Sequence, residues 1–346
     1  MNPMRQERGF NLVELMIGLT ISLMGLAAVA SMMMTFSKNR GSVAQTQAAQ
    51  DNGVMALYRL ERDISQAGYG LMDLQGCTPT IVDGDAVIPS FSVLPITIGF
   101  VGTGVSDTIL VQGANPISGI PGTELSSPIA GGNTMTTVQF NVRSGVGFAV
   151  NDRVATDALA PNCSLVTVTS VTDVPANGAI PAYTAIGYTP ALTATTAAGF
   201  LANFGAGPVP RDFYSRQYAV GLSGLTVADY PLYVTSNLVD NIVFMKAQYG
   251  LASTTSSTTV TSWVSGATAI NSTNIQRVIA LRVGVVARST KREDDEIDQP
   301  NPLPLFNEKA DSTGGVDAVS FTIPDMHMRY RAYSTIIPLK NVIWTR

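Results

Sequence analysis

The chain has 346 residues, enough for one large domain or two small ones around a sizeable hydrophobic core. Hydrophobic residues make up 45% of it, which excludes general disorder, and charged residues only 13%, which favours an exported β-rich domain over a cytosolic enzyme. The net charge is −4 and no basic stripe occurs, so the sequence offers no electrostatic basis for binding nucleic acid.

A short polar segment precedes a long apolar run at the start of the chain. Met1–Gly9 contains Arg5 and Arg8, and no charged residue then occurs from Leu15 to Phe36. Such a run is long enough to cross a bilayer as a helix. It is apolar on all sides, unlike a helix that packs only one face on a soluble core. We therefore expect a membrane-spanning helix here.

The helical pattern continues beyond the apolar run, from Ser42 to Ala67. Apolar residues recur there at spacings of three and four, which predicts one buried stripe: Val54, Leu57, Leu60, Ile64 and Ala67. Gly68 and Gly70 then favour a helix end. The sequence thus predicts one helix of about 55–60 residues, its first half apolar all round and its second half amphipathic.

From Leu71 onward, short β-prone runs alternate with turn residues. The expected strands are Asp107–Val111, Thr134–Val142, Leu165–Val174, Leu238–Tyr249, Arg277–Ala287 and Met328–Pro338. Ala176–Pro210 is rich in Ala, Thr, Gly and Pro and is interpreted as long loops, and Ala252–Ser262 as a further surface loop. We expect an α+β fold, with the long helix packed on an antiparallel β-rich domain.

The chain has two cysteines, Cys77 and Cys163. A pair is compatible with one disulfide bond if the domain lies in an oxidising compartment, and two buried free thiols are the alternative. Their spacing is not the CxxC of a zinc or redox site.

Glu14 lies four residues inside the apolar segment. A carboxylate at the centre of a bilayer costs about 2.5–3.5 kcal/mol or more, so this residue should have a reason to be there. Gly9, just before the apolar run, leaves the backbone open to a protease. Cleavage after Gly9 would create an α-amine on Phe10, a natural partner for a carboxylate. Because the geometry within one helix is poor, we expect that amine to come from a neighbouring subunit.

The block Arg8–Leu15, with its Gly-Phe-Asn-Leu-Val-Glu order, closely resembles the signal of type IV pilins and type II secretion pseudopilins. The resemblance implies that a prepilin peptidase cleaves after Gly9 and N-methylates Phe10, and that Glu14 is the assembly carboxylate. Two alternatives remain open. An ordinary secretory signal peptide would be cleaved before Ser31, and a plain membrane anchor would never be cleaved.

Further segments resemble the PilW group of minor pilins. They are Leu60–Gly70 followed by Cys77, Leu238–Ile242 through Gln248–Gly250, Arg277–Ser289 and the tail Arg329–Asn341. This implies a non-catalytic subunit that primes pilus assembly and sits in the tip complex. The implied partners are the prepilin peptidase, sister minor pilins, the major pilin, a tip adhesin and the inner-membrane assembly platform. The alternatives are a J-type pseudopilin of a type II secretion system and a membrane-anchored adhesin or sugar-binding protein.

The resemblance divides the chain into four expected segments. These are a leader peptide at 1–9, a transmembrane and assembly helix at 10–37, an amphipathic helix at 38–70 and an exported β-rich domain with long loops at 71–346. The N-terminus is expected in the cytoplasm and the domain in the periplasm, with the inner membrane between them. The mature subunit is then expected outside the cell, in the pilus.

No residue is expected to be catalytic, and no cofactor is expected. His327 is the only histidine, so a multi-histidine metal site is impossible, and it is interpreted as a strand residue. The charged run Lys291–Asp298 is interpreted as a solvated hairpin loop. A weak calcium site formed by Asp294, Asp295, Glu296 and Asp298 is the alternative there, because these residues lack the spacing and turn glycine of an EF-hand.

Overall fold

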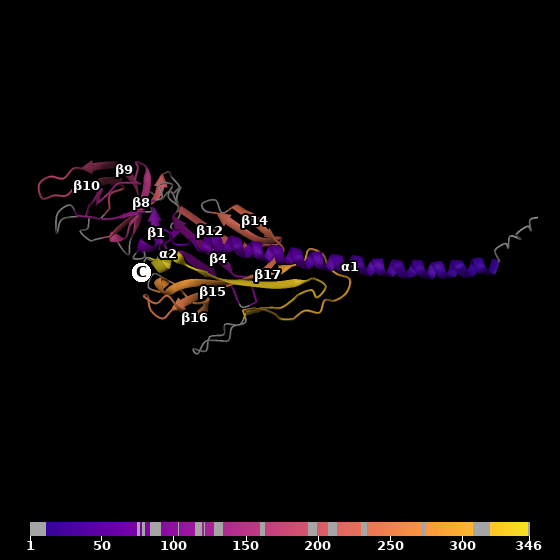
Figure 1. Ribbon diagram of the computed structural model, residues 1–346. Helices are drawn as coiled ribbons and strands as arrows, with labels where there is room; N and C mark the ends of the chain where they lie inside the picture. The colour runs from indigo at the N-terminus through magenta and orange to yellow at the C-terminus, as the bar shows by residue number, and fades with distance from the viewer. Residues whose placement is uncertain are drawn as a thin grey trace, which may run out of the picture.

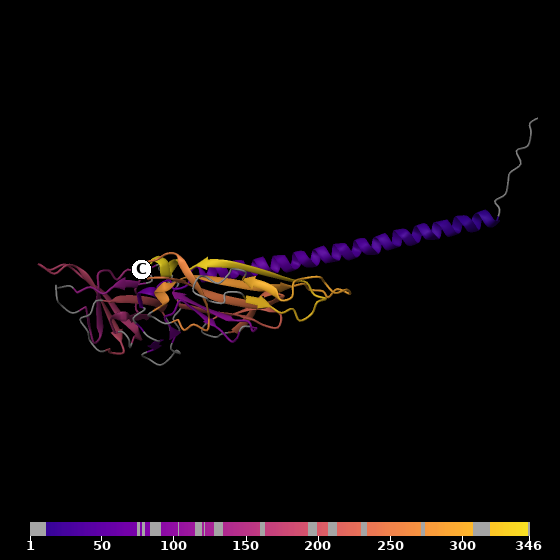
Figure 2. The same cartoon turned by 90° about the horizontal axis from the view of Figure 1, so that it is seen from below.

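The computed structural model describes residues 12–74, 77, 80–83, 91–102, 104–114, 120, 122–127, 134–159, 163–192, 199–206, 213–229, 234–270, 274–306 and 319–344. Helix α1 (Leu12–Ile64) is 53 residues long. Its first half projects alone from the molecule and its second half lies on a β-rich domain (Figure 1 and, turned, Figure 2). The expected α+β fold, with one long N-terminal helix, is confirmed.

Two antiparallel sheets form the body of the domain beside α1. The four-stranded sheet has the order β16 (Val260–Ser265), β15 (Ile242–Ala252), β17 (Val278–Arg288) and β20 (Tyr330–Pro338). The five-stranded sheet has the order β14 (Val234–Asp240), β13 (Gly224–Asp229), β12 (Phe213–Val220), β4 (Thr108–Ala114) and β3 (Ile96–Gly99). Helix α1 packs chiefly on β17 and β20 and also touches β14 and β15.

The buried face of α1 starts with small residues and ends with large ones. Its fully buried side chains include Ala49, Ala56, Leu60 and Ile64, which share one core with residues of both sheets. Small residues allow close approach of the helix to the sheet, and the larger ones fill the space near its end. The helix stops at Ile64, and the chain turns through Gly68 and Gly70, both of which have positive φ angles.

A third sheet lies at the end of the molecule far from the projecting part of α1 (Figure 1). Its main path is β5 (Gly122–Glu124), β11 (Phe200–Ala206), β8 (Asp152–Thr156), β9 (Ser164–Val174), β10 (Tyr183–Thr189), β7 (Gln139–Val142) and β6 (Met135–Thr136). Leu125, which follows β5, bridges to Val142 of β7, and the amide of Ser126 donates to the carbonyl of Asn141 at 2.9 Å. The path therefore closes on itself as a small barrel, which leaves few unpaired edges.

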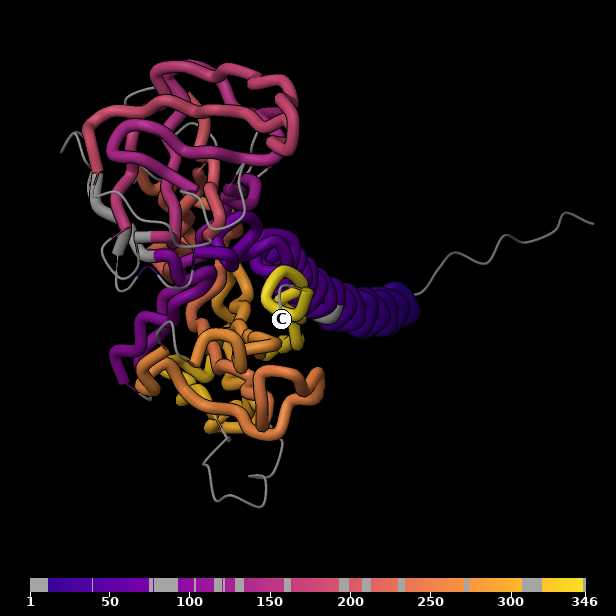
Figure 3. The backbone as a smooth tube through the Cα atoms, turned by 90° about the vertical axis from the view of Figure 1, so that its left-hand side faces the viewer, coloured from indigo at the N-terminus to yellow at the C-terminus, as the bar shows by residue number. Residues whose placement is uncertain are grey.

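The barrel has its own core and is inserted into the five-stranded sheet. Phe140 and Tyr188 stack inside it with ring centroids 4.1 Å apart. The chain leaves β4 at Ala114 and returns at Phe213 in β12, and these two residues are partners across the sheet. The barrel thus begins and ends at one point of the body, and Figure 3 shows it as a separate lobe beside α1 and the four-stranded sheet.

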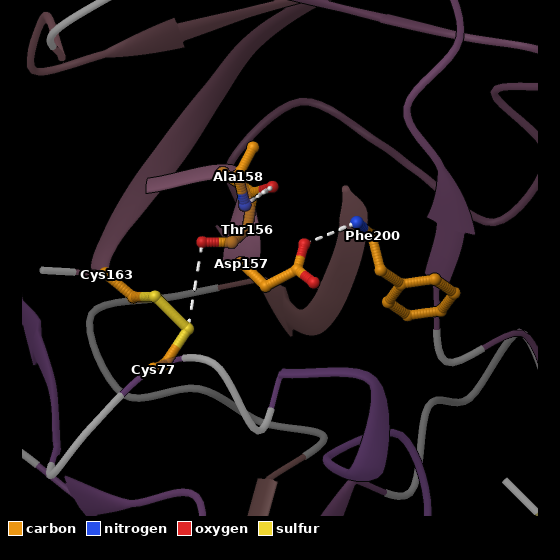
Figure 4. Close-up of a disulfide and its surroundings, with 6 residues drawn as sticks. All are labelled: Cys77, Thr156, Asp157, Ala158, Cys163 and Phe200. Atoms are coloured by element: carbon orange, nitrogen blue, oxygen red, sulfur yellow. Dashed lines mark hydrogen bonds between the residues drawn. A yellow bond between two sulfur atoms is a disulfide. The ribbon is translucent and has the colours of Figure 1, made fainter. Parts of the chain in front are cut away.

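A disulfide bond between Cys77 and Cys163 joins the barrel to the segment after α1. Their Cα atoms are 5.4 Å apart (Figure 4). Cys77 follows the 3-10 helix η1 (Met72–Leu74), and Cys163 directly precedes β9. The Sγ of Cys77 lies 3.8 Å from the carbonyl oxygen of Thr156, at the end of β8. Both cysteines are buried in a small core between barrel and body.

The remaining elements complete the two ends of the molecule. They are β1 (Thr80–Asp83), β2 (Phe91–Ser92), 3-10 helices η2 (Asp157–Leu159) and η3 (Ile275–Arg277), the hairpin of β18 (Leu303–Phe306) and β19 (Val319–Phe321), and α2 (Lys340–Trp344). Strand β1 pairs with β9 in parallel, unlike the other strand pairs of the described residues.

Several sequence-based expectations for local structure are wrong. Thr134–Val142 is not one strand but the hairpin of β6 and β7. Ala176–Pro210 is not a region of loops alone, because it contains β10 and β11. Leu238–Tyr249 is not one strand: Asn241, with a φ of 59°, turns the chain from β14 into β15. The stripe of α1 also runs through Gly53 and Ala56, whereas Val54 is 54% exposed.

Candidate assembly surface

The projecting part of α1 has no contact with the rest of the described chain that would bury its apolar side chains. From Leu12 to Phe36 every residue is exposed, and α1 is the one helix in the described residues that is long and apolar enough to cross a membrane. Its hydroxyl groups bond to the helix itself: Ser22 donates to the carbonyl of Gly18 at 2.8 Å, and Thr35 to that of Ser31 at 3.0 Å. A helix with satisfied polar groups could anchor in lipid or pack against other helices.

Glu14 lies in the first turn of this projecting part, and its side chain is exposed. The helix N-terminus favours an anion at that place, because amide groups there lack partners within the helix. The two residues of the predicted cleavage site, Gly9 and Phe10, lie outside the described residues, as does the predicted leader 1–9. Their roles therefore remain predictions.

The loop 289–298 grips α1 where the helix leaves the domain. Oε1 of Gln45 accepts three hydrogen bonds from this loop, from the amides of Thr290 and Lys291 at 3.1 and 3.2 Å and from the Thr290 hydroxyl at 2.7 Å. Lys38 and Asp295, both largely exposed, approach to 4.0 Å. The contact to Gln45 fixes where the projecting part of the helix begins.

The charged run Lys291–Asp298 is largely exposed to solvent, as expected from the sequence, but it is not a hairpin. It follows β17 and leads to β18, which pairs with β19 rather than with β17. Arg329 holds Glu293 through two bonds, of 2.5 and 3.1 Å, and Ile297 is buried. The run is thus a loop fixed by the Glu293–Arg329 pair and by buried Ile297, next to the residues that bind Gln45 of α1.

The calcium candidates Asp294, Asp295, Glu296 and Asp298 are exposed in that loop. Among the residues that the structure describes, no three His, Cys, Asp or Glu side chains are grouped to hold a metal ion. The ring of His327 is used locally, with Nδ1 3.1 Å from the carbonyl oxygen of Glu293. His327 follows β19 in the loop before β20 and is not a strand residue.

A polar network that the sequence did not suggest fixes the end of α1 to the five-stranded sheet. Oδ2 of Asp63 accepts from Arg216 at 2.9 Å and from the hydroxyl of Tyr218. Arg216 also donates to Asp229 at 2.8 Å. Burial, with the hydrogen bond to Asp63 adding to it, raises the pKa of Tyr218 well above its usual value. The network orients the last turn of α1. The hydroxyl of Tyr218 keeps its proton, with which it donates to Asp63.

The C-terminal segment is joined to the same end of α1. The side-chain amide of Asn341 donates to the carbonyls of Gln66 and Ala67 at 3.0 and 3.1 Å, and the hydroxyl of Tyr214 also donates to Gln66 at 3.1 Å. These carbonyls lie just past the helix end, where acceptors lack partners within the helix. Tyr214 and Asn341, from distant segments, donate hydrogen bonds to these carbonyls, and the bonds of Asn341 position α2 beside α1.

A buried ion pair connects the two sheets of the body. Nζ of Lys246 in β15 lies 2.7 Å from Oδ1 of Asp107, just before β4, and the side chains are 3% and 0% exposed. The amide of Ala247 donates to the other carboxylate oxygen at 3.1 Å. Burial raises the pKa of Asp107, although Lys246 opposes the shift. The pair is a structural tie, because it is enclosed and offers no access to a substrate.

Comparison with protein families gave one match to part of the chain. Residues 225–341 match the model of the family described as PilW, type IV pilus-assembly protein W. The matched segment runs from β13 to α2 and includes the whole four-stranded sheet beneath α1, but not the barrel. A search of curated proteins gave no match, and a search of solved structures gave none.

Proposed function

We propose that this chain is a minor pilin of type IV pilus assembly, a non-catalytic subunit that primes the pilus and sits in its tip complex. Its residues 225–341 match the PilW family of type IV pilus assembly. The observation that carries the proposal is the combination of that match with an exposed apolar helix fixed at its base to an exported-type domain.

The first step is anchoring in the inner membrane. The segment 10–37 spans the bilayer with the N-terminus in the cytoplasm, and the disulfide bond fits a periplasmic location for the rest, because such bonds persist in oxidising compartments. Prepilin peptidase removes the leader 1–9 and methylates Phe10. The helix keeps its apolar surface and so can move from lipid into a bundle of similar helices with little change in environment.

Glu14 then fixes the register of that bundle. A lone carboxylate in an apolar helix is stabilised where a cation reaches it, and the α-amine of a neighbouring subunit is such a cation. Only one axial offset between two helices brings the amine of one to the carboxylate of the other. The charge thus selects the position at which sister minor pilins and the major pilin join.

The position of the barrel supports placement at the tip. The barrel extends the molecule at the end away from the projecting helix (Figure 1), which is the end that points away from the membrane during assembly. If this chain lay within the fibre, the subunit stacked above it would meet the barrel. If this chain lies at the tip, the space above the barrel is free for a tip adhesin. Assembly from below remains possible, because the projecting helix is unobstructed.

The test is a deletion of the gene in its own host, with complementation by the wild-type chain. We expect few or no surface pili in the deletion strain by electron microscopy, restored pili on complementation, and labelling of the barrel by gold-conjugated antibody at fibre ends. Normal pili together with lost protein secretion would instead assign the chain to a secretion pseudopilus. Labelling along the whole fibre would contradict placement at the tip.

A further inference from the structure

A cleft beside the end of α1 has the composition of a protein-binding site. We call it the Trp344 cleft. It has a volume of about 580 Å³, and its lining includes Arg62, Tyr69, Tyr214, Arg216, Lys340 and Trp344. These residues come from α1 and the turn after it, from β12 and from α2, and Figures 1 and 3 place α2 beside α1 at this point. Segments that are far apart in the sequence therefore build one concave surface.

Trp344 is the notable member of this surface. It is 76% exposed, although α2 is held in place by buried Val342 and Leu339 and by the Asn341 bonds to the carbonyls after α1. The tryptophan is thus presented to solvent on a fixed support. Tryptophan, tyrosine and arginine dominate the binding energy of protein interfaces, because they combine a large apolar area with hydrogen-bonding groups.

The charge of the cleft is positive in a chain that is negative overall. Its lining contains three cations and one acid, Asp63, whereas the whole chain carries a net charge of −4. Asp63 is already held by Arg216 at 2.9 Å and by Tyr218, and Arg216 is shared with Asp229. Arg62 lies only at 3.8 Å from Asp63, so Arg62 and Lys340 supply the positive charge that faces the open cleft.

From this arrangement we propose that the Trp344 cleft binds an acidic segment of a partner pilus subunit. A carboxylate of that segment is paired with Arg62 and Lys340, and an apolar neighbour packs on the indole ring of Trp344. Arginine and lysine at an interface rim attract an acidic partner and set its orientation. The assignment of the partner as a pilus subunit rests on the proposed function.

The cleft also lies on the part of α1 that is packed on the domain, remote from the projecting segment. Contacts made there are independent of helix bundling through the apolar run. The Trp344 cleft and the projecting apolar part of α1 would together bind a partner subunit at two points along its length. Loss of the cleft contact is therefore expected to weaken one partner and leave anchoring in the membrane unchanged.

The experiment places a photo-reactive residue in the cleft of the full-length chain, in cells that carry the complete pilus assembly system. Trp344→p-benzoylphenylalanine is irradiated, and the cross-linked peptide is identified by mass spectrometry. Leu222→p-benzoylphenylalanine is the control for general exposure, because Leu222 is fully exposed in a turn of the five-stranded sheet. We expect a cross-link from position 344 to a pilin-type subunit, within a few residues of an aspartate or glutamate, and none to that segment from position 222.

Charge reversal tests the electrostatic part. Arg62→Glu is expected to reduce the yield of the cross-link about tenfold, which corresponds to the cost of one opposed charge pair. Arg143→Glu, which changes the net charge equally on the barrel, is expected to leave it unchanged. Thermal unfolding and the intact disulfide bond show that each variant is folded. A second reversal, Lys340→Glu, repeats the test on another element.

The outcomes separate this proposal from the function on which it rests. A cross-link to a segment without acidic residues, an unchanged yield in both reversals, or no subunit cross-link at position 344 overturns it. So does binding of an anionic polysaccharide such as polygalacturonate without a subunit cross-link. If the wild-type chain restores pili and the reversals have no effect, the cleft proposal alone fails. If the deletion strain makes normal pili, the proposed function fails.

Discussion

The ring of Tyr333 in β20 occupies the place where a side chain on Gly53 of α1 would lie. A Cβ added to Gly53 would be 2.2 Å from Cδ2 and 2.4 Å from Cε2 of that ring. The absence of a side chain at Gly53 therefore lets α1 pack directly against the flat ring of Tyr333, which sets the distance between helix and sheet. This contact lies between the grip of loop 289–298 on Gln45 and the Asp63 network at the helix end.

Gly53→Ala is expected to destabilise the domain. Alanine favours the helix by about 1 kcal/mol, but overpacking against the partly buried ring of Tyr333 costs about 1–3 kcal/mol, so the net change is a loss. Gly41→Ala is the matched control, because nothing lies within 4 Å of a Cβ at Gly41 and the propensity gain is not opposed. Thermal unfolding of the full chain in detergent measures both. Equal stabilisation by the two substitutions would contradict the close packing at Tyr333.

The buried pair of Lys246 and Asp107 makes an asymmetric prediction. Lys246→Met or Asp107→Leu alone is expected to cost about 3–5 kcal/mol, because each leaves a buried charged group without its partner. The double variant Lys246→Met with Asp107→Leu is expected to recover much of that loss, since apolar residues of similar volume need no partner. Denaturant unfolding of all three variants gives the coupling. Purely additive losses would show that the pair does not act as a unit.

Removal of the disulfide bond is expected to weaken the join between barrel and body. The bond closes a loop with a sequence separation of 86, and its loss by Cys77→Ser with Cys163→Ser is expected to cost about 2–5 kcal/mol. Limited proteolysis should then cut between barrel and body before the barrel itself is degraded. Wild-type protein treated with a reductant should behave like the double variant, and equal protease resistance in all forms would refute this role.

Glu14→Ala is expected to separate anchoring from assembly. The substitution removes a costly charge from the apolar run, so membrane insertion remains intact, while association with sister subunits weakens because their amine loses its carboxylate. Membrane fractionation measures the first effect, and co-purification of sister minor pilins from solubilised membranes measures the second. Unchanged co-purification would remove the register role from Glu14. Ser22→Ala, on the same exposed helix, is the control.

The sequence predicted the large features of the fold because their signals are local and repeated. An uncharged run longer than a membrane is thick predicts a projecting helix, and the two glycines after Ile64 predict its end. The precise face of α1 was harder to predict. Gly53 and Ala56 line the contact, but hydropathy gives small residues little weight, so Val54 and Leu57 were preferred although Val54 is exposed.

The barrel strands in Ala176–Pro210 were missed because their residues are typical of loops. Strand β10 contains Tyr183, Thr184, Ala185 and Gly187, and only the alternation of its buried positions identifies it once the structure is known. The sequence does indicate the assembly surface at Glu14, because a carboxylate is unexpected in an otherwise apolar segment. Lys246 and Asp107, 139 residues apart, gave no comparable signal, since neither lies in a run that makes its charge unexpected.

The facing positions of Ala114 and Phe213 make the barrel an exchangeable cassette. Because departure and return occur at one rung of an antiparallel ladder, a foreign domain with closely spaced termini could be grafted there, provided that Cys77 and β1, whose partners Cys163 and β9 leave with the barrel, are redesigned with it. A fluorescent protein or an antigen carried at that junction would stand at the far end of the subunit. The graft would then mark, in a living cell, where each copy is added to a growing fibre.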